Sequence, residues 1–563
     1  MAPLPLESEL RNSYTGLAVV VLHVSSAIYF IWTVGKSLSY SYKSLSPSQD
    51  VRLRLDQRRR LVPLFSVLAL LSLSTALYSA VKYSSLSYRV WADQRGYLPS
   101  GNTNSAVGGI LKDNLASTSE TAQLNATQLA AYKVRWLADT PIYQDAFEIV
   151  AEKARRYWWG QQVDLSFVPW SALLAVEGTR RRIPHLFAFL SLAHLVNLSF
   201  AQNLFYVALL LTPAPLPDVG QQQQPTRWSR IRDSLFPPKP ANWCLSPGFF
   251  LLSSMASYGS IFLVPYAAET PSFSRIIGIS RACTFVPLIL QKAAPASWGT
   301  VQSDPHKAHA AFTDLFRLMS FMSVTLHGLA TLTGLRYNLP DSHYHRHSRF
   351  LPWDIEKRSK WDRTTTAVGR ILGSTLDHPV VAAVGYDVLL SGTSAGLWAA
   401  VRSLGAGDIL TSVVPLYNND NDNDNDGSEE ATSEKPSGGT SQSSSSTTGS
   451  VRRSGRNRKD SSSVNNNNST ASRASEDHPE PPPPAPTTTR RRGRPRKVKQ
   501  DPEEEPGDKT YVPSPGEKAS AEGDALPSQE LDLEAAALAW GLMAVGGLGL
   551  GSAGVFGGEC LAR

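Results

Sequence analysis

Acidic side chains near or inside apolar segments are the residues of this sequence most able to do chemistry. Asp145 and Glu148 are three residues apart, so on a helix they share one face. Asp387 lies about two turns inside an apolar stretch. An ionisable group at that depth is a candidate functional residue. The alternative is a structural ion pair with an arginine of another apolar stretch, Arg281 or Arg317.

Polar side chains also border the apolar segment that follows these acids. Trp158 and Trp159 are typical of a membrane interface. Gln161, Gln162 and Asp164 come directly after them, where polar groups usually face a cavity or a partner helix. The alternative interpretation is an aromatic belt preceded by a solvated amphipathic helix.

A basic run near the C-terminus resembles the AT-hook, a motif that lies extended in the minor groove of A·T-rich DNA. In such a segment glycine lets the backbone approach the groove floor, proline keeps the path extended, and arginines enter the electronegative groove. The resemblance implies a DNA partner; the alternative is a basic disordered segment. The matching residues are Arg492, Gly493, Arg494, Pro495 and Arg496.

Long stretches without Asp, Glu, Lys or Arg must position these residues. A bilayer core needs about 20 such residues per helix. The sequence therefore predicts an all-α, multi-pass transmembrane bundle of eight or nine spans, with the lipid bilayer as a partner. The charge-free stretches are 12–35, 61–81, 183–217, 240–268, 318–335 and 535–558, and the further segments counted as spans are 163–176, 274–291 and 379–401.

Arginine clusters between these stretches predict the sides of the loops. By the positive-inside rule, loops 35–60 and 336–377 and the triplet Arg180-Arg181-Arg182 are cytosolic. The loop from Lys82 to Gln162, which carries the glycosylation pattern at Asn125, lies on the opposite side. Nine spans starting from an outside N-terminus place segment 403–533 outside, whereas the basic content of 451–499 favours the opposite side, so both sides stay open for this segment. We expect an endomembrane location, the endoplasmic reticulum.

Composition divides the chain into three regions. Residues 1–410 form the helical membrane domain, 411–530 a disordered low-complexity tether with the AT-hook-like motif, and 531–563 the final transmembrane helix. The last span is predicted over Ala535–Phe556, where repeated Gly-x-x-x-Gly spacing favours close helix packing. ATP-driven transport and familiar hydrolase chemistry have no motif to support them.

Several short motifs resemble a family of filamentous-fungal multi-pass membrane proteins: Trp158-Trp159-x-Gln161-Gln162, Phe200-Ala201-Gln202-Asn203-Leu204-Phe205 and Gly385-Tyr386-Asp387. That family is distantly similar to membrane-integral terpene cyclases related to UbiA-type prenyltransferases. The resemblance implies a membrane enzyme acting on an isoprenoid or lipid substrate with Mg²⁺. It also implies that Asp139, Asp145 and Glu148 are the candidate metal ligands and candidate catalytic residues. Asp387 is a further catalytic candidate because of its depth in an apolar stretch.

Two other functions remain open on the sequence. The first is a non-catalytic membrane transporter or scaffold, which a polar path through the bundle would support. The second is a membrane-tethered protein that binds A·T-rich DNA through its tail, which depends on the side that the tether occupies.

Overall fold

The structure is a computed structural model, and every residue it describes belongs to one compact unit. The AT-hook-like motif and most of the predicted tether lie outside the described residues, so those predictions remain predictions. The described ranges are 14–43, 51–95, 126–212, 243–301, 312–402, 404–415 and 532–561.

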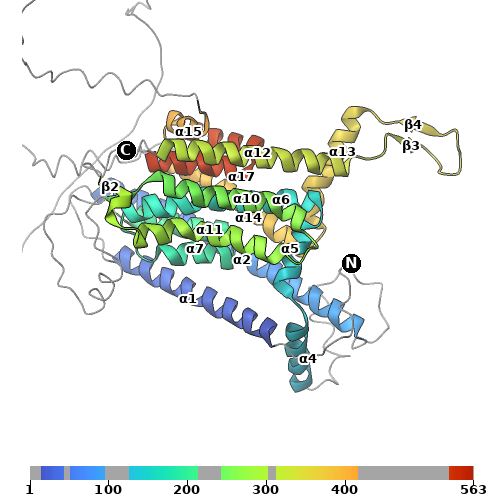
Figure 1. Ribbon diagram of the computed structural model, residues 1–563, viewed down its shortest axis with the longest axis horizontal. Helices are drawn as coiled ribbons and strands as arrows, with labels where there is room; N and C mark the ends of the chain where they lie inside the picture. Colours follow the sequence, from blue (N-terminus) through green and yellow to red (C-terminus); the bar gives the residue numbers. More distant parts are fainter. Residues whose placement is uncertain are drawn as a thin grey trace, which may run out of the picture. The chain divides into compact units, whose positions relative to one another are not determined.

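Helices make up almost all of the described chain, which confirms the all-α prediction (Figure 1). Two small antiparallel sheets pair Cys244 with Thr300 and Tyr344 with Glu356. The strands are β1 (Trp243–Leu245), β2 (Gly299–Val301), β3 (His343–His345) and β4 (Ile355–Lys357). The α-helices are α1 (Thr15–Lys43), α2 (Val51–Gln94), α4 (Ala126–Asp139), α5 (Ile142–Ala151), α6 (Ala154–Leu173), α7 (Leu186–Leu195), α8 (Leu198–Leu211), α10 (Pro247–Ala267), α11 (Phe273–Ala293), α12 (Thr313–Asn338), α13 (Lys360–Leu372), α14 (Pro379–Arg402), α15 (Ala406–Val413) and α17 (Leu533–Leu561).

Seven helices of the described chain are long and apolar enough to cross a membrane: α1, α2, α10, α11, α12, α14 and α17. Their outer faces keep large apolar side chains exposed, for example Leu22, Trp32 and Leu252. Exposing a large apolar surface to water is unfavourable, whereas contact of the same surface with lipid tails is not. The composition and the surface are therefore compatible with a membrane protein.

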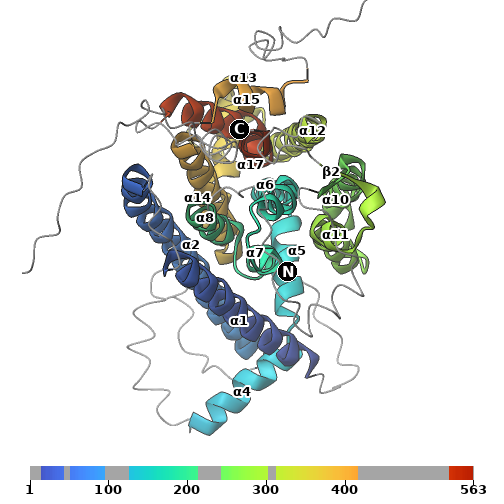
Figure 2. The same ribbon diagram turned by 90° about the vertical axis from the view of Figure 1, so that its left-hand side faces the viewer.

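Helix α6 lies at the centre of the bundle, although its polar residues keep it out of that apolar set. It contacts α10, α11, α12, α14 and α17 (Figure 2). A π-helical turn, η3 (Leu174–Gly178), continues it. Fourteen of its twenty residues are buried, Gln161 and Gln162 among them. Buried amide groups need hydrogen-bond partners, which the surrounding helices of the bundle supply.

Contacts at the two ends of α6 define the two ends of the bundle. At its start, Arg155 forms an ion pair with Asp377, at 2.7 Å, just before α14 begins. Just beyond η3, Arg181 and the last residue of α14, Arg402, both contact Glu559 of α17, at 3.5 and 3.0 Å. We call the first the cavity end, because Arg155 lines a cavity there, and the second the arginine end.

The apolar stretch 184–216, expected to be one tilted span, is a hairpin of the two short helices α7 and α8. Phe189 of α7 packs against Phe205 of α8, with ring centroids 5.5 Å apart. Helix α8 runs antiparallel to α2, since Asn197 donates to the Ser72 carbonyl at 3.0 Å and Arg58 to the Leu210 carbonyl at 3.1 Å. The hairpin therefore enters from the arginine end and returns to it.

Asn197 is the physical reason for this turn. Its backbone is extended, and its side chain accepts a hydrogen bond from the Phe200 N–H at 3.1 Å, which caps the start of α8. Apolar length alone does not distinguish a helix that crosses from two that fold back.

The predicted last span, Ala535–Phe556, also turns back, at Gly547 (φ 78°, ψ 173°). The Asp532 N–H donates to the Ala400 carbonyl at 3.1 Å, so the first arm starts at the arginine end. The second arm ends there too, where Glu559 contacts Arg402. Each arm has about 14 residues and is about 21 Å long, which is short of a bilayer core of about 30 Å.

Because of the first hairpin, α10, α11, α12 and α14 run opposite to the direction that nine alternating spans predict. Loop 336–377 lies at the cavity end, where the Ser374 hydroxyl donates to the Arg155 carbonyl at 3.0 Å. That is the same end as the loop between α2 and α6, so assigning loops 336–377 and 82–162 to opposite sides was wrong. Segment 403–531 starts and finishes at the arginine end, alongside Arg180-Arg181-Arg182.

Candidate functional site

The polar border of α6 supplies three side chains to three different partners. Gln161 Nε2 lies 3.3 Å from His327 Nδ1 on α12. Gln162 Oε1 accepts a hydrogen bond at 3.2 Å from the N–H of Leu548, just past the turn of α17. Asp164 is 3.5 Å from Arg281 of α11. These groups therefore face partner helices, one of the two arrangements predicted for them, and Gln161 also borders a cavity.

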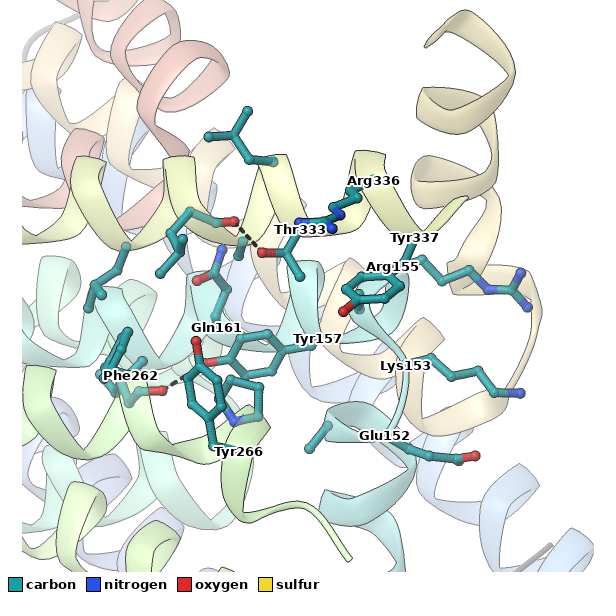
Figure 3. A pocket seen from close by; sticks show the side chains of 18 of the residues that line it. Glu152, Lys153, Arg155, Tyr157, Gln161, Phe262, Tyr266, Thr333, Arg336 and Tyr337 are labelled. Atoms are coloured by element: carbon teal, nitrogen blue, oxygen red, sulfur yellow. Dashed lines mark hydrogen bonds between the residues drawn. The ribbon is translucent and has the colours of Figure 1, made fainter. Parts of the chain in front are cut away.

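A cavity of about 910 Å³ opens between α6, α10 and α12 (Figure 3). Helices α10 and α12 are joined where the Tyr258 hydroxyl contacts Ser323 Oγ at 3.0 Å, and the cavity lies on the cavity-end side of this contact. Tyr157 closes its inner wall by donating to the Ile261 carbonyl at 2.8 Å. The cavity thus occupies the space left where α10 and α12 are no longer in contact.

Charge is distributed unevenly around this cavity. Its charged lining residues are Glu152, Lys153, Arg155 and Arg336, which lie toward one side of it in Figure 3. Arg155 is paired with Asp377, whereas Lys153 and Arg336 form no ion pair with any described residue. The excess of positive charge at this rim favours an anion.

The remaining wall is apolar and reaches the outer surface of the bundle. Leu332 and Tyr266 are each 68% exposed and Phe262 is 40% exposed, although all three line the cavity. These exposures show that the cavity opens sideways between α10 and α12, on a face that would meet lipid. The other apolar lining residues on these two helices are Ile261, Pro265, Leu326, Leu329 and Ala330.

None of the four acids predicted from the sequence lines this cavity. Asp139 is held by Arg95 at 2.9 Å and by the Trp91 indole at 3.3 Å. Glu148 accepts a hydrogen bond from Gln144 at 2.9 Å. Burial, together with the nearby Glu148 carboxylate, raises the pKa of Asp145 to about 6.

The three predicted metal ligands do not fit a Mg²⁺ site. Such a site needs hard oxygen ligands that converge on one ion with near-octahedral geometry. No group of three or more His, Cys, Asp or Glu residues in the described part of the chain could hold a metal. Asp139 is also engaged by an arginine, so we derive no chemistry through Mg²⁺.

Asp387 lies at the tip of the α7–α8 hairpin. Its carboxylate accepts hydrogen bonds from the N–H groups of Leu198 and Ser199, at 3.1 and 2.8 Å. A negative charge at the start of a helix is favourable, so Asp387 holds the hairpin tip against α14. Neither suggested arginine partners it: Arg281 contacts Asp164, and Arg317 contacts Asp314.

Two clusters of charged side chains were missed by sequence reasoning. In one, Arg281 also contacts His194 at 3.4 Å, and the His194 ring lies between Phe167 and Phe285. In the other, Glu177 and Glu559 are buried among arginines at the arginine end. Isolated charges within or beside apolar stretches were the available signal, but Arg281 is 87 residues from His194 in sequence, and Glu559 is 157 residues from Arg402.

Comparison of the chain with protein-family profiles, with curated proteins and with solved structures gives no match.

Proposed function

We propose that this chain is a multi-pass membrane protein that binds an amphiphile with an anionic head group in the cavity between α6, α10 and α12. The observation that carries the proposal is the combination of a basic rim and an apolar wall open to the outer face. A phosphate-type head group would contact Lys153 and Arg336, and its hydrocarbon tail would lie along Phe262 and Leu329. Phospholipids and isoprenyl phosphates share this chemistry.

The cavity supports lipid binding but carries no argument for cyclase chemistry. An isoprenoid cyclase needs an acidic, metal-binding wall, whereas the charged rim described here is mainly basic. We therefore propose a lipid-handling role without assigning a catalytic residue.

Transport is a second candidate function, favoured by the two helical hairpins. Many transporters use interrupted helices to bring helix ends to the middle of the membrane. Here the tips at Asn197 and Gly547 both lie inside the bundle. A flux assay in proteoliposomes loaded with the bound lipid would separate transport from simple binding.

The binding proposal is tested with the full chain in detergent, by native mass spectrometry with added phosphatidic acid, phosphatidylcholine or farnesyl phosphate. We expect both phosphate monoesters to bind and phosphatidylcholine to bind more weakly. The double variant Lys153→Gln/Arg336→Gln removes two contacts of about 1 kcal/mol each, which should weaken binding about 30-fold.

The matched control is Lys133→Gln/Arg275→Gln, which removes the same charge from residues that do not line the cavity. It should bind as the unmodified chain does. Equal loss in both double variants would indicate a nonspecific charge effect, and no loss in either would exclude the cavity as the binding site.

A further inference from the structure

Buried polar side chains recur on one face of α8 and on one face of α14, two helices that pack together. Two contacts set the register: the Ser199 N–H donates to Asp387 at 2.8 Å, and Tyr206 stacks on Trp398 with ring centroids 4.5 Å apart. Between these contacts lie four further polar residues, one or two helical turns from Ser199 or Asp387 and on the same helix faces. They are Gln202 and Asn203 on α8, and Ser391 and Ser394 on α14. We call this region the α8–α14 seam.

Six buried polar atoms of the seam form no hydrogen bond with any residue that the structure describes. Gln202, Asn203, Tyr206, Ser391 and Ser394 are each 0% exposed. No described residue forms a hydrogen bond with either amide atom of Gln202, with Asn203 Oδ1, or with the hydroxyls of Tyr206, Ser391 and Ser394. Each buried polar group left unpaired costs about 1–3 kcal/mol. Six such atoms in one seam therefore point to a bound ligand.

The mixture of donors and acceptors identifies the chemistry of that ligand. Gln202 presents an unpaired N–H donor and an unpaired carbonyl acceptor in one side chain. A cation satisfies acceptors only, whereas a water molecule donates and accepts. Buried water typically makes two to four hydrogen bonds to such groups.

The seam ends at charged groups in both directions. One end is the Asp387 carboxylate inside the bundle. At the other end, the Trp398 indole N–H donates to Glu559 at 3.3 Å, and Glu559 contacts Arg402, whose side chain is 18% exposed at the arginine end. We propose that ordered water fills the α8–α14 seam from Asp387 toward this cluster and exchanges with bulk water.

X-ray radiolysis of the full chain in H₂¹⁸O tests this directly, because hydroxyl radicals formed from bound water oxidise the side chains beside it. Tyr258 is a matched control: it is 1% exposed, as buried as Tyr206, but its hydroxyl is bonded to Ser323 and the Met319 carbonyl. We expect Tyr206 to be oxidised several-fold faster than Tyr258 and to carry ¹⁸O. Equal, slow oxidation would overturn the proposal, and oxidation without ¹⁸O would exclude exchange with bulk water.

Variants that fill or depolarise the seam give a second readout. Ser391→Val/Ser394→Val should reduce oxidation of Tyr206 to the rate of Tyr258. The control Ser253→Val/Ser254→Val alters buried serines that bond to the Phe250 carbonyl within α10, and it should leave Tyr206 unchanged. If the first variant does not fold, Gln202→Leu, of similar volume, replaces it. Unchanged oxidation of Tyr206 in a folded seam variant contradicts a water-filled seam.

Discussion

The turn at Gly547 should make this residue one of the least replaceable in α17. Its backbone, at φ 78° and ψ 173°, lies in a region that is open essentially only to glycine. A side chain there costs on the order of 1–3 kcal/mol. A Cβ atom at this position would also lie 2.7 Å from His327 Nδ1.

The neighbouring ring has little room to move away. His327 is bonded to Gln161 at 3.3 Å and packs on Trp158 with ring centroids 5.4 Å apart. We therefore expect Gly547→Ala to lower the free energy of unfolding by about 3 kcal/mol. For a chain of this size that corresponds to a decrease in Tm of about 6 °C.

Thermal unfolding of the full chain in detergent, followed by tryptophan fluorescence, measures this change. Gly541→Ala is the matched control, because it lies in the same helix and a Cβ there would meet no atom within 4 Å. Alanine at an ordinary helical position stabilises by about 0.5–1 kcal/mol. A rise in Tm for both variants would refute the turn, since a straight α17 would treat the two glycines alike.

Four further predictions follow from the fold and its charges. Met543→Cys/Gly551→Cys should form a disulfide under mild oxidation, detectable as a linked peptide, because Gly551 packs on Met543 in the hairpin; a straight helix would separate the two by about 12 Å, beyond disulfide reach. Glu559→Gln should destabilise the chain by about 3–5 kcal/mol, since it leaves Arg402 with a neutral partner, although Arg181 keeps Glu177. Glu534→Gln at the exposed start of α17 should have little effect in the same thermal assay. If the arginine end is cytosolic, a gel-shift assay should show glycosylation of Asn125 and none at Asn468, because the segments containing them start and finish at opposite ends of the bundle; modification of both would contradict this topology. The raised pKa of Asp145 means that the folded state holds its proton between pH 3.8 and about 6, so the free energy of unfolding should decrease as pH rises through that window, and Asp145→Asn should remove this dependence.

Apolar segments predicted the long apolar helices well because composition determines where such a helix can form. The expected spans around Tyr29, Leu61 and Leu318 lie within α1, α2 and α12. Direction was not predictable in the same way. A stretch such as 184–216 has the same composition whether it crosses or returns, and only a single polar residue, Asn197, marks the turn.

The cavity was beyond sequence reasoning for a different reason. Lys153 lies in the link between α5 and α6, and Arg336 lies near the end of α12. Both line the cavity because α10 and α12 leave space beside α6. Asp387 was correctly placed inside an apolar helix. Its role as a cap for α8 depends on a helix break that composition does not reveal.

The described residues on either side of segment 416–531 are both packed into the folded bundle, α15 before it and the C-terminal hairpin after it. The Asp532 N–H bonds to the Ala400 carbonyl, and Ser552 contacts Ser166 at 2.7 Å in the interior. A break in the peptide chain between 416 and 531 would therefore leave two fragments held by packing and by the buried glutamate–arginine contacts. The protein should therefore fold when it is made as two separate polypeptides, with the final 32 residues binding to the rest of the bundle as a second chain.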